Sequence, residues 1–258
     1  MAGSTRKIQR YGWIPDLPDH RDHLYAAPVM ALAKQPAKMD LRTKCPPVYD
    51  QGQLGSCTAN AIAAAIQFNR IKLKLKPKFV PSRLFIYYNE RVMEGTAHTD
   101  SGAQIRDGIK SVAQQGDCPE KEWPYDIAKF AVKPSAKCYQ DAKKYKAVTY
   151  QRLVQALSQL KGCLASGYPF VYGFTVYESF ESAAVAKSGV MPMPQPKEKV
   201  LGGHAVLAVG YDDAQQRFIV RNSWGRNWGM KGYFTMPYSY LTDNNLADDI
   251  WTIRLVTA

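Results

Sequence analysis

The stretch CTANAIAAAIQFNRI, which begins at Cys57, constrains the fold more than any other part of the chain. Alanine is the strongest helix former, and Ile62 and Ile66 stand one helical turn apart. The run is apolar on nearly all sides, which is typical of a helix buried inside a large domain. Ser56 is a suitable N-cap, so the sequence predicts that Cys57 lies at the N-terminus of a buried helix.

A cysteine in this position can be reactive. The thiolate is the nucleophilic form, and the partial positive charge of a helix N-terminus favours it. Most free cysteines are simply small buried residues, and this is our interpretation of Cys45, Cys118, Cys138 and Cys163. No two cysteines have C-x-x-C spacing, which argues against a structural zinc site. The odd number of cysteines leaves at least one thiol free, but it does not identify the redox compartment.

The rest of the chain indicates an α+β fold. Helical patterns follow at about 81–94, 103–115 and 150–162, and short β-rich runs lie at 170–177, 204–211, 217–224, 232–238 and 250–256. Helices come first and strands later, which favours two lobes over alternating strand–helix units. We therefore expect a helical lobe at about 45–148 and a β lobe at about 149–258.

Residues 1–35 differ from the rest of the chain. Their prolines and clustered charges show no helical or strand period, so we expect an extended arm. Tyr11, Trp13, Ile14 and Leu17 give this arm apolar anchors, and we expect it to dock on the domain formed by residues 36–258. It could lie along the cleft and restrain an enzyme, or it could brace the back of the fold.

The charge of the chain points to no particular partner. The net charge is +12, and its clearest basic run is IKLKLKPK at 71–78, which we expect to be a solvated strand or loop. No nucleic-acid motif accompanies it, so nucleic acid is not an expected partner. No apolar stretch approaches the length of about 18 residues that a spanning helix needs, so we expect no membrane insertion. No apolar run follows the basic N-terminus, which favours a cytoplasmic location over secretion.

A base for Cys57 can be sought among only four histidines. His204 alone opens an apolar strand, GGHAVLAVG, where the backbone can hold an imidazole; read by itself it would more commonly be a hydrogen-bonded core residue. Asn222 follows another strand, and its side-chain oxygen could accept the second N–H of the histidine. Gln51 precedes Cys57 by six residues and could donate to an oxyanion.

Four motifs in order give these residues a context. MDLR at 39–42, QGQLGSCTANA at 51–61, GGHAVLAVGY at 202–211 and NSWGRNWGMKGYF at 222–234 resemble the papain-like cysteine peptidases, in particular the bacterial branch of that family. The resemblance covers nearly all of residues 36–258. It implies a helical lobe and an antiparallel β-barrel lobe with the active site between them. It also implies hydrolysis of polypeptides through a thioester by a thiolate–imidazolium pair, without cofactor or metal, by an enzyme that is expected to be a monomer and an endopeptidase.

The resemblance also assigns roles to single residues. Cys57 would be the nucleophile, His204 its base and Asn222 the residue that orients the histidine, while Gln51 and the Cys57 N–H would hold the oxyanion. The residues that would bind substrate or border the main specificity pocket are Gly102, Ala103, Gln104, Gly202, Gly203 and Trp224. Leu54 stands where the family usually has a disulfide cysteine, so we expect that bridge to be absent. Thr58 replaces the usual aromatic residue after the nucleophile.

Other functions fit the sequence less well. A transferase of the transglutaminase kind would usually orient its histidine with aspartate, and Asn222 argues against it. A non-catalytic module that kept the fold would be indicated by loss of Cys57, His204 or Gln51, and all three are present. No G-x-S-x-G motif supports a serine hydrolase. The arm, if it covers the cleft, would make the protein a zymogen.

Overall fold

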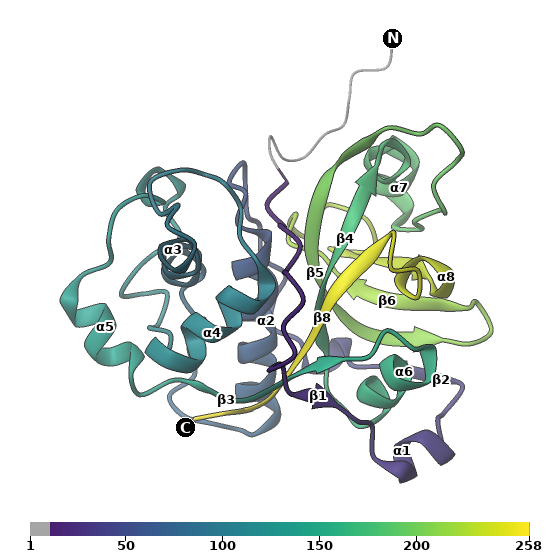
Figure 1. Cartoon of the computed structure of the whole chain (residues 1–258), viewed down its shortest axis with the longest axis horizontal. Coiled ribbons are helices and arrows are strands. Elements are labelled where there is room, and N and C mark those ends of the chain that lie inside the picture. Colours follow the sequence, from purple (N-terminus) through teal and green to yellow (C-terminus); the bar gives the residue numbers. More distant parts are fainter. Residues whose placement is uncertain (1–10, 258) are drawn as a thin grey trace.

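The buried helix that begins at Cys57 forms the centre of the molecule. The computed structural model describes residues 11–257 of the 258-residue chain. Helix α2 (Cys57–Lys72) is buried along most of its length, and it lies between a group of helices and a sheet (Figure 1). The other α-helices are α1 (Val29–Ala33), α3 (Arg83–Met93), α4 (Ile105–Gln115), α5 (Ala136–Ala142), α6 (Leu157–Ala165), α7 (Ala183–Ser188) and α8 (Tyr238–Leu241). Helices α2 to α5 form one lobe.

The second lobe is built on a largely antiparallel sheet. Its strands are β1 (Leu24–Tyr25), β2 (Lys38–Asp40), β3 (Ala147–Leu153), β4 (Phe170–Tyr177), β5 (Val200–Asp212), β6 (Arg217–Arg221), β7 (Tyr233–Pro237) and β8 (Ala247–Val256). Their order is β1-β3-β8-β4-β5-β6-β7, and β2 pairs with β5 at one end. The short β1 pairs with β3 in parallel. This arrangement is the α+β, two-lobe fold that the motifs imply.

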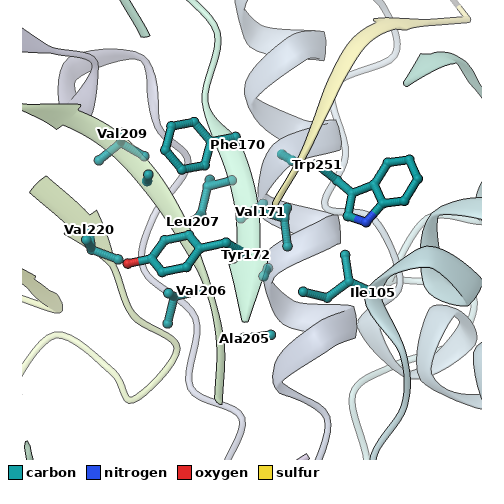
Figure 2. Close-up of a cluster of buried hydrophobic side chains, with 14 of the residues drawn as sticks. Ile105, Phe170, Val171, Tyr172, Ala205, Val206, Leu207, Val209, Val220 and Trp251 are labelled. Atoms are coloured by element: carbon teal, nitrogen blue, oxygen red, sulfur yellow. The ribbon is translucent and has the colours of Figure 1, made fainter. Parts of the chain in front are cut away.

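Both faces of the central strands are buried. Residues 170–174 of β4 and 204–211 of β5 are almost fully covered, and Figure 2 shows Val171 directed toward α2 while Tyr172 lies on the opposite side, toward β5 and β6. Ile105 and Trp251 line the helical side of the same core. A strand that is buried on both faces reads as a continuous apolar run, which explains the sequence FVYGFTVY. The core therefore holds β5 firmly against α2.

One helix prediction was wrong in half its length. Residues 150–153 belong to β3, which pairs with β8, and only the second half of the predicted helix 150–162 is helical, in α6. The start of β3 reads Ala-Val-Thr-Tyr, and β-branched and aromatic residues fit a pleated surface. Pairing with a distant strand therefore decided the conformation of this segment.

Three smaller expectations also need correction. Ser56 occupies the N-cap position of α2, but its hydroxyl bonds Tyr125 and Asn60 and does not cap the helix. The basic run at 71–78 begins as the last turn of α2, and only its remainder is a loop. Leu17 is 75% exposed, so it does not anchor the arm.

The structure also shows the state of the cysteines and whether any described helix could span a membrane. All five cysteines are free thiols, and Cys118 and Cys138 lie in one small apolar cluster with Phe85. Within residues 11–257, none of the helices combines the length and the apolar character needed to cross a bilayer.

Candidate active site

Cys57 is the first residue of α2 and is completely buried. Burial is the main influence on its thiol and raises the pKa of Cys57 to about 12. The backbone amides of Ala205, Gly12 and Thr58 act in the opposite direction, because they can donate to the sulfur and so stabilise the thiolate. Ala205 follows His204 in β5, so the sulfur lies beside the backbone of the histidine strand.

His204 and Asn222 are in direct contact. The His204 Nε2 lies 2.8 Å from the Asn222 Oδ1, and the same oxygen accepts the Ser223 N–H at 2.8 Å. An oxygen can only accept, so in neutral His204 the proton lies on Nε2 and the free lone pair lies on Nδ1. Nδ1 has no hydrogen-bond partner among the described residues. Burial lowers the pKa of His204 to about 4, although the bond to Asn222 opposes this shift.

Aromatic rings surround the imidazole. The Trp224 ring centroid lies 5.0 Å from that of His204, and the Phe174 centroid lies 5.7 Å from it. Trp224 is 1% exposed and packs in turn on Phe180 and Trp228. These rings keep water away from the bond between His204 and Asn222. Trp224 also lies beside the arm, with its ring centroid 6.4 Å from that of Tyr11.

Gln51 is also buried and is held in one orientation. Its Oε1 accepts a hydrogen bond from the Ser223 hydroxyl at 2.6 Å, and its Nε2 donates to the Leu54 carbonyl at 2.9 Å. The amide has two N–H groups, so one remains to donate to a ligand. Ser223 therefore contacts both Gln51 and Asn222. It was missed by the sequence analysis, although its place directly after Asn222 could have suggested it.

Thr58 makes a polar contact where the family has an aromatic ring. Its hydroxyl donates to the Glu90 Oε1 at 2.6 Å, and the Glu90 Oε2 has no partner among the described residues. Burial raises the pKa of Glu90 well above its usual range. The helix that bears Cys57 is thus tied to α3 through a buried carboxyl group.

The arm occupies the space in front of these groups. Figure 1 shows its first described residues, in dark purple, running between the two lobes. The Trp13 N–H donates to the Gly203 carbonyl at 2.9 Å, and the Ala103 N–H donates to the Gly12 carbonyl at 2.7 Å. Residues 12–14 of the arm thus bond to the backbone of both lobes in the cleft between them, before the arm joins the sheet as β1.

Most of the predicted substrate-binding residues line this segment of the arm. Gly102 has a φ of +77°, and a Cβ there would lie 2.3 Å from the Gly12 oxygen. A Cβ on Gly202 would lie 2.7 Å from the Cβ of Tyr11. Gln104 differs from the others, since it precedes α4 and donates its N–H to the Glu94 Oε1 at 2.7 Å. Its known contact is with the helical lobe and not with the arm.

The sequence analysis also missed Asp249, which lies beneath the arm. Its carboxylate is fully buried and accepts the Trp13 Nε1–H. The pair Asp248 and Asp249 lies near the start of β8, directly before the buried residues Ile250 and Trp251, and these two adjacent carboxylates were the available signal.

Comparison with known proteins shows the family of this chain. Residues 35–250 match the papain family of cysteine proteases. This chain belongs to that family.

Its relatives include proteins of very different organisms. The chain is similar to xylellain, a cysteine protease from Xylella fastidiosa, with 51% identity, 95% of each chain covered and a TM-score of 0.89. It is 51% identical over 216 residues to an uncharacterised peptidase C1-like protein of Acanthamoeba polyphaga mimivirus, covering 81% of this chain and 70% of the viral protein. It is 31% identical to a cathepsin B-like protein of Giardia intestinalis, covering 73% of this chain and 63% of that protein. The chain thus spans less than two thirds of the Giardia protein.

Proposed function

We propose that this chain is a cysteine peptidase in which Cys57 attacks peptide carbonyls and His204 transfers the proton. The observation that carries the proposal is the hydrogen bond of 2.8 Å between His204 and Asn222, which fixes the ring and leaves Nδ1 as the free nitrogen. Cys57 begins α2 beside the backbone of the same strand. Membership of the papain family supports these roles. Residues 36–258 would form the catalytic domain.

The reaction follows from these positions. The Cys57 thiolate adds to the carbonyl carbon, and the new oxyanion accepts hydrogen bonds from the Cys57 N–H and the free Nε2–H of Gln51. His204 then gives its proton to the leaving amine as the C–N bond breaks, which leaves a thioester on Cys57. His204 next takes a proton from water, whose oxygen attacks the thioester. The acid is released, and the thiolate and imidazolium are restored.

We further propose that the arm holds the enzyme inactive. With the arm in place, Cys57 and His204 are both fully buried. Burial favours the neutral thiol and the neutral imidazole, since it raises the pKa of Cys57 to about 12 and lowers the pKa of His204 to about 4. Departure of the arm would admit water and favour the ion pair. The arm would therefore suppress the reactive form of the nucleophile as well as block the cleft.

The orientation of the arm supports inhibition over self-cleavage. The backbone amide of Gly12 lies near the sulfur of Cys57, where it favours the thiolate. The Gly12 carbonyl accepts the Ala103 N–H instead of lying near Gln51. The Gly12 carbonyl is therefore bonded to the helical lobe and is not free for attack.

Labelling with an epoxide inactivator of papain-like enzymes tests both parts of the proposal. The full chain, a form lacking residues 1–35 and a Cys57→Ala control would be labelled and digested, and the modified peptide would be identified by mass spectrometry. We expect labelling at Cys57 alone, and faster labelling without the arm. Equal rates would refute the gate and keep the peptidase, whereas no labelling at Cys57 in either form would refute the peptidase. Cleavage of an internally quenched peptide would test the endopeptidase action that we propose.

A further inference from the structure

The side chain of Trp13 fills a socket in the β lobe. The tryptophan is 9% exposed, although it belongs to the arm. A Cβ on Gly173 would lie 1.9 Å from the Trp13 Cε2, and a Cβ on Gly203 would lie 2.7 Å from its Cε3. Any side chain at these two positions would occupy the space of the ring. The two glycines therefore form the walls of a site that accepts one large side chain.

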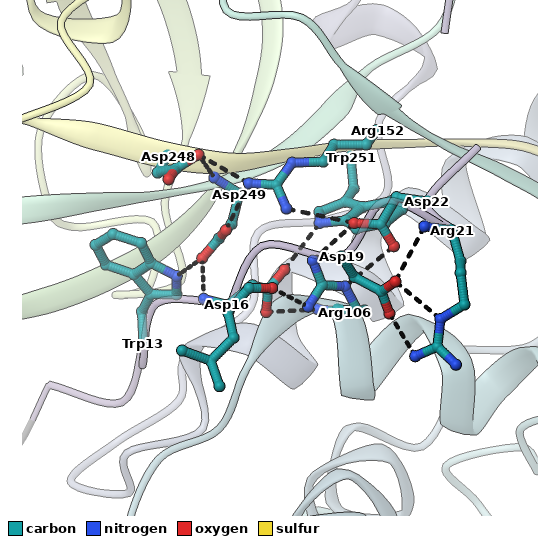
Figure 3. Close-up of polar contacts among 11 residues, drawn as sticks. Trp13, Asp16, Asp19, Arg21, Asp22, Arg106, Arg152, Asp248, Asp249 and Trp251 are labelled. Atoms are coloured by element: carbon teal, nitrogen blue, oxygen red, sulfur yellow. Dashed lines mark hydrogen bonds and ion pairs between the residues drawn. The ribbon is translucent and has the colours of Figure 1, made fainter. Parts of the chain in front are cut away.

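Asp249 forms the polar end of this socket (Figure 3). Its Oδ2 accepts the Trp13 Nε1–H at 3.0 Å and the Asp16 N–H at 2.7 Å, while its Oδ1 accepts a hydrogen bond from Arg152 at 3.1 Å. Both donors to Oδ2 come from the arm. The Arg152 donor belongs to β3 and would remain if the arm left.

A bulge in β8 directs Asp249 into the cleft. Gly173 of β4 pairs with Asp248, whereas Val171 pairs with Trp251, so β8 contains one extra residue between these pairs. Asp249 lies in this extra stretch with a φ of +55°, which is unusual for any residue other than glycine. Bulges commonly occur beside active sites, where they change the direction of a side chain. The fold thus holds a buried carboxylate in a strained backbone conformation at the end of the socket.

The arm residue that fills the socket directly follows the arm residue that lies at the nucleophile. Gly12 contacts Cys57, and Trp13, the next residue, bonds to Gly203 through its backbone. If the proposed peptidase function holds, a substrate would use the same backbone groups of Ala103 and Gly203. The side chain of a substrate residue adjacent to the scissile residue would then enter the socket. The Asp249 Oδ2 would be without its two donors from the arm when that side chain arrives.

We propose that Asp249 makes this socket select peptides with a basic side chain, arginine foremost, at that position. A guanidinium can restore both hydrogen bonds that Oδ2 loses, whereas leucine would leave a buried carboxylate oxygen unpaired. Arg152 does not cancel the effect, because Asp248 also accepts a hydrogen bond from it, at 3.0 Å, and remains with it in the β lobe. Asp16 and Asp22, which also lie near the arginines, leave with the arm. The proposal rests on the proposed function and specifies its substrate class.

Matched peptides can test this selectivity on the full chain. The variant Trp13→Ala empties the socket, and two fluorogenic peptide amides would differ only in arginine or leucine at the second residue before the scissile bond. We expect kcat/KM to be at least about tenfold higher for arginine, since a site built for a hydrogen-bonding group strongly rejects an analogue that lacks it. Adding Asp249→Asn should abolish most of this preference, mainly by lowering kcat/KM for the arginine substrate. Asp248→Asn is the matched control and should keep the preference.

A second measurement covers the case in which these variants fail to fold. Two peptidyl acyloxymethyl ketones, with arginine or leucine at the same position, would be used to label Cys57 in the unmodified full chain. Faster labelling by the arginine compound supports the proposal. Equal rates, a preference for leucine, or an arginine preference that survives Asp249→Asn would refute it. Absence of turnover by Trp13→Ala, together with absence of labelling in both the full chain and the form lacking residues 1–35, would refute the peptidase function itself, and the proposal with it.

Discussion

Gly12 of the arm and Gly55 of the loop before α2 pack backbone against backbone, so that a Cβ on Gly12 would lie 1.7 Å from the Gly55 carbonyl oxygen. This approach brings the arm close to Cys57. We therefore predict that Gly12→Ala displaces the arm and speeds the labelling of Cys57 by about tenfold or more, since each 1.4 kcal/mol of lost docking energy is about a factor of ten. Labelling rates at fixed reagent concentration would measure this. The exposed Leu17→Ala is the control within the arm, and an unchanged rate for Gly12→Ala would contradict the gate.

The docking of the arm should weaken as the pH rises to about 7. Burial, and next the nearby Asp16 carboxyl, raise the pKa of Asp249 to about 7, while Arg152 opposes the shift. Burial also raises the pKa of Asp16, whose carboxylate bonds Arg106 and Trp251. A raised pKa means that the docked state binds a proton more tightly than the open state. Docking is therefore strongest below the pKa of Asp249 in the open state, weakens as the pH rises to about 7, and changes no further above it.

The labelling rate of the full chain divided by that of Trp13→Ala would isolate this effect. The pH dependence of the labelling reaction itself is common to both proteins and cancels in this ratio. We expect the ratio to rise as the pH increases to about 7, the raised pKa of Asp249, and to level off above it. Asp249→Asn, with Asp248 and Arg152 intact, should give a much flatter profile. A ratio that falls with increasing pH would show that another group controls docking.

The ion pair between Asp22 of the arm and Arg106 of α4 should hold the arm in place. The two side chains are only 7% and 6% exposed, their atoms approach to 2.7 Å, and Arg106 also donates to the Leu17 carbonyl. Removing one partner of a buried pair leaves an uncompensated charge, which commonly costs about 3–5 kcal/mol. We predict that Asp22→Asn lowers the Tm and speeds labelling of Cys57 at least about tenfold.

The pair between Asp19 and Arg21 provides the control for this experiment. It also lies in the arm, but its arginine side chain is 77% exposed. Ion pairs in such surroundings contribute little to stability. Asp19→Asn should therefore leave both the Tm and the labelling rate unchanged, and equal effects of the two variants would argue against a specific role for Asp22.

Ser223 should support catalysis through Gln51. Loss of an oxyanion donor typically lowers kcat by about 10²–10³-fold, and we expect this of Gln51→Ala. Ser223→Ala removes the hydrogen bond to the Gln51 Oε1, and we expect a several-fold smaller kcat with an unchanged KM. The double variant should be no worse than Gln51→Ala, because contacting residues are not additive. Fully additive losses would instead indicate that Ser223 acts independently of Gln51.

Part of the site could be predicted before the fold was known, because its residues lie within recognisable local patterns. The alanine-rich run after Cys57 could form only a buried helix, and the apolar strand after His204 could only be internal. Segments with weaker patterns were decided by distant partners. Residues 150–153 are the clearest case, since pairing with β8 made a strand of an apparent helix.

The arm shows why the remaining features could not be predicted. Its prolines and aromatic residues predicted an extended, docked segment, but either face of the fold could have received it. Only the tertiary structure brings Trp13 between Gly173 and Gly203, which are separated by 160 or more residues from it in sequence.

The sequence by itself therefore determined which residues we propose for the chemistry: a cysteine at the start of a buried helix, a histidine on an internal strand, and the asparagine and glutamine that accompany them. These are properties of residue type and local period, which the chain carries before it folds. The tertiary structure decided which segment covers these residues and which side chain faces that segment. The arm lies in the cleft because both lobes offer backbone groups there, and Asp249 faces it because a bulge in β8 turns one residue inward. Neither the edge of a folded sheet nor a bulge in its register exists until distant segments have come together.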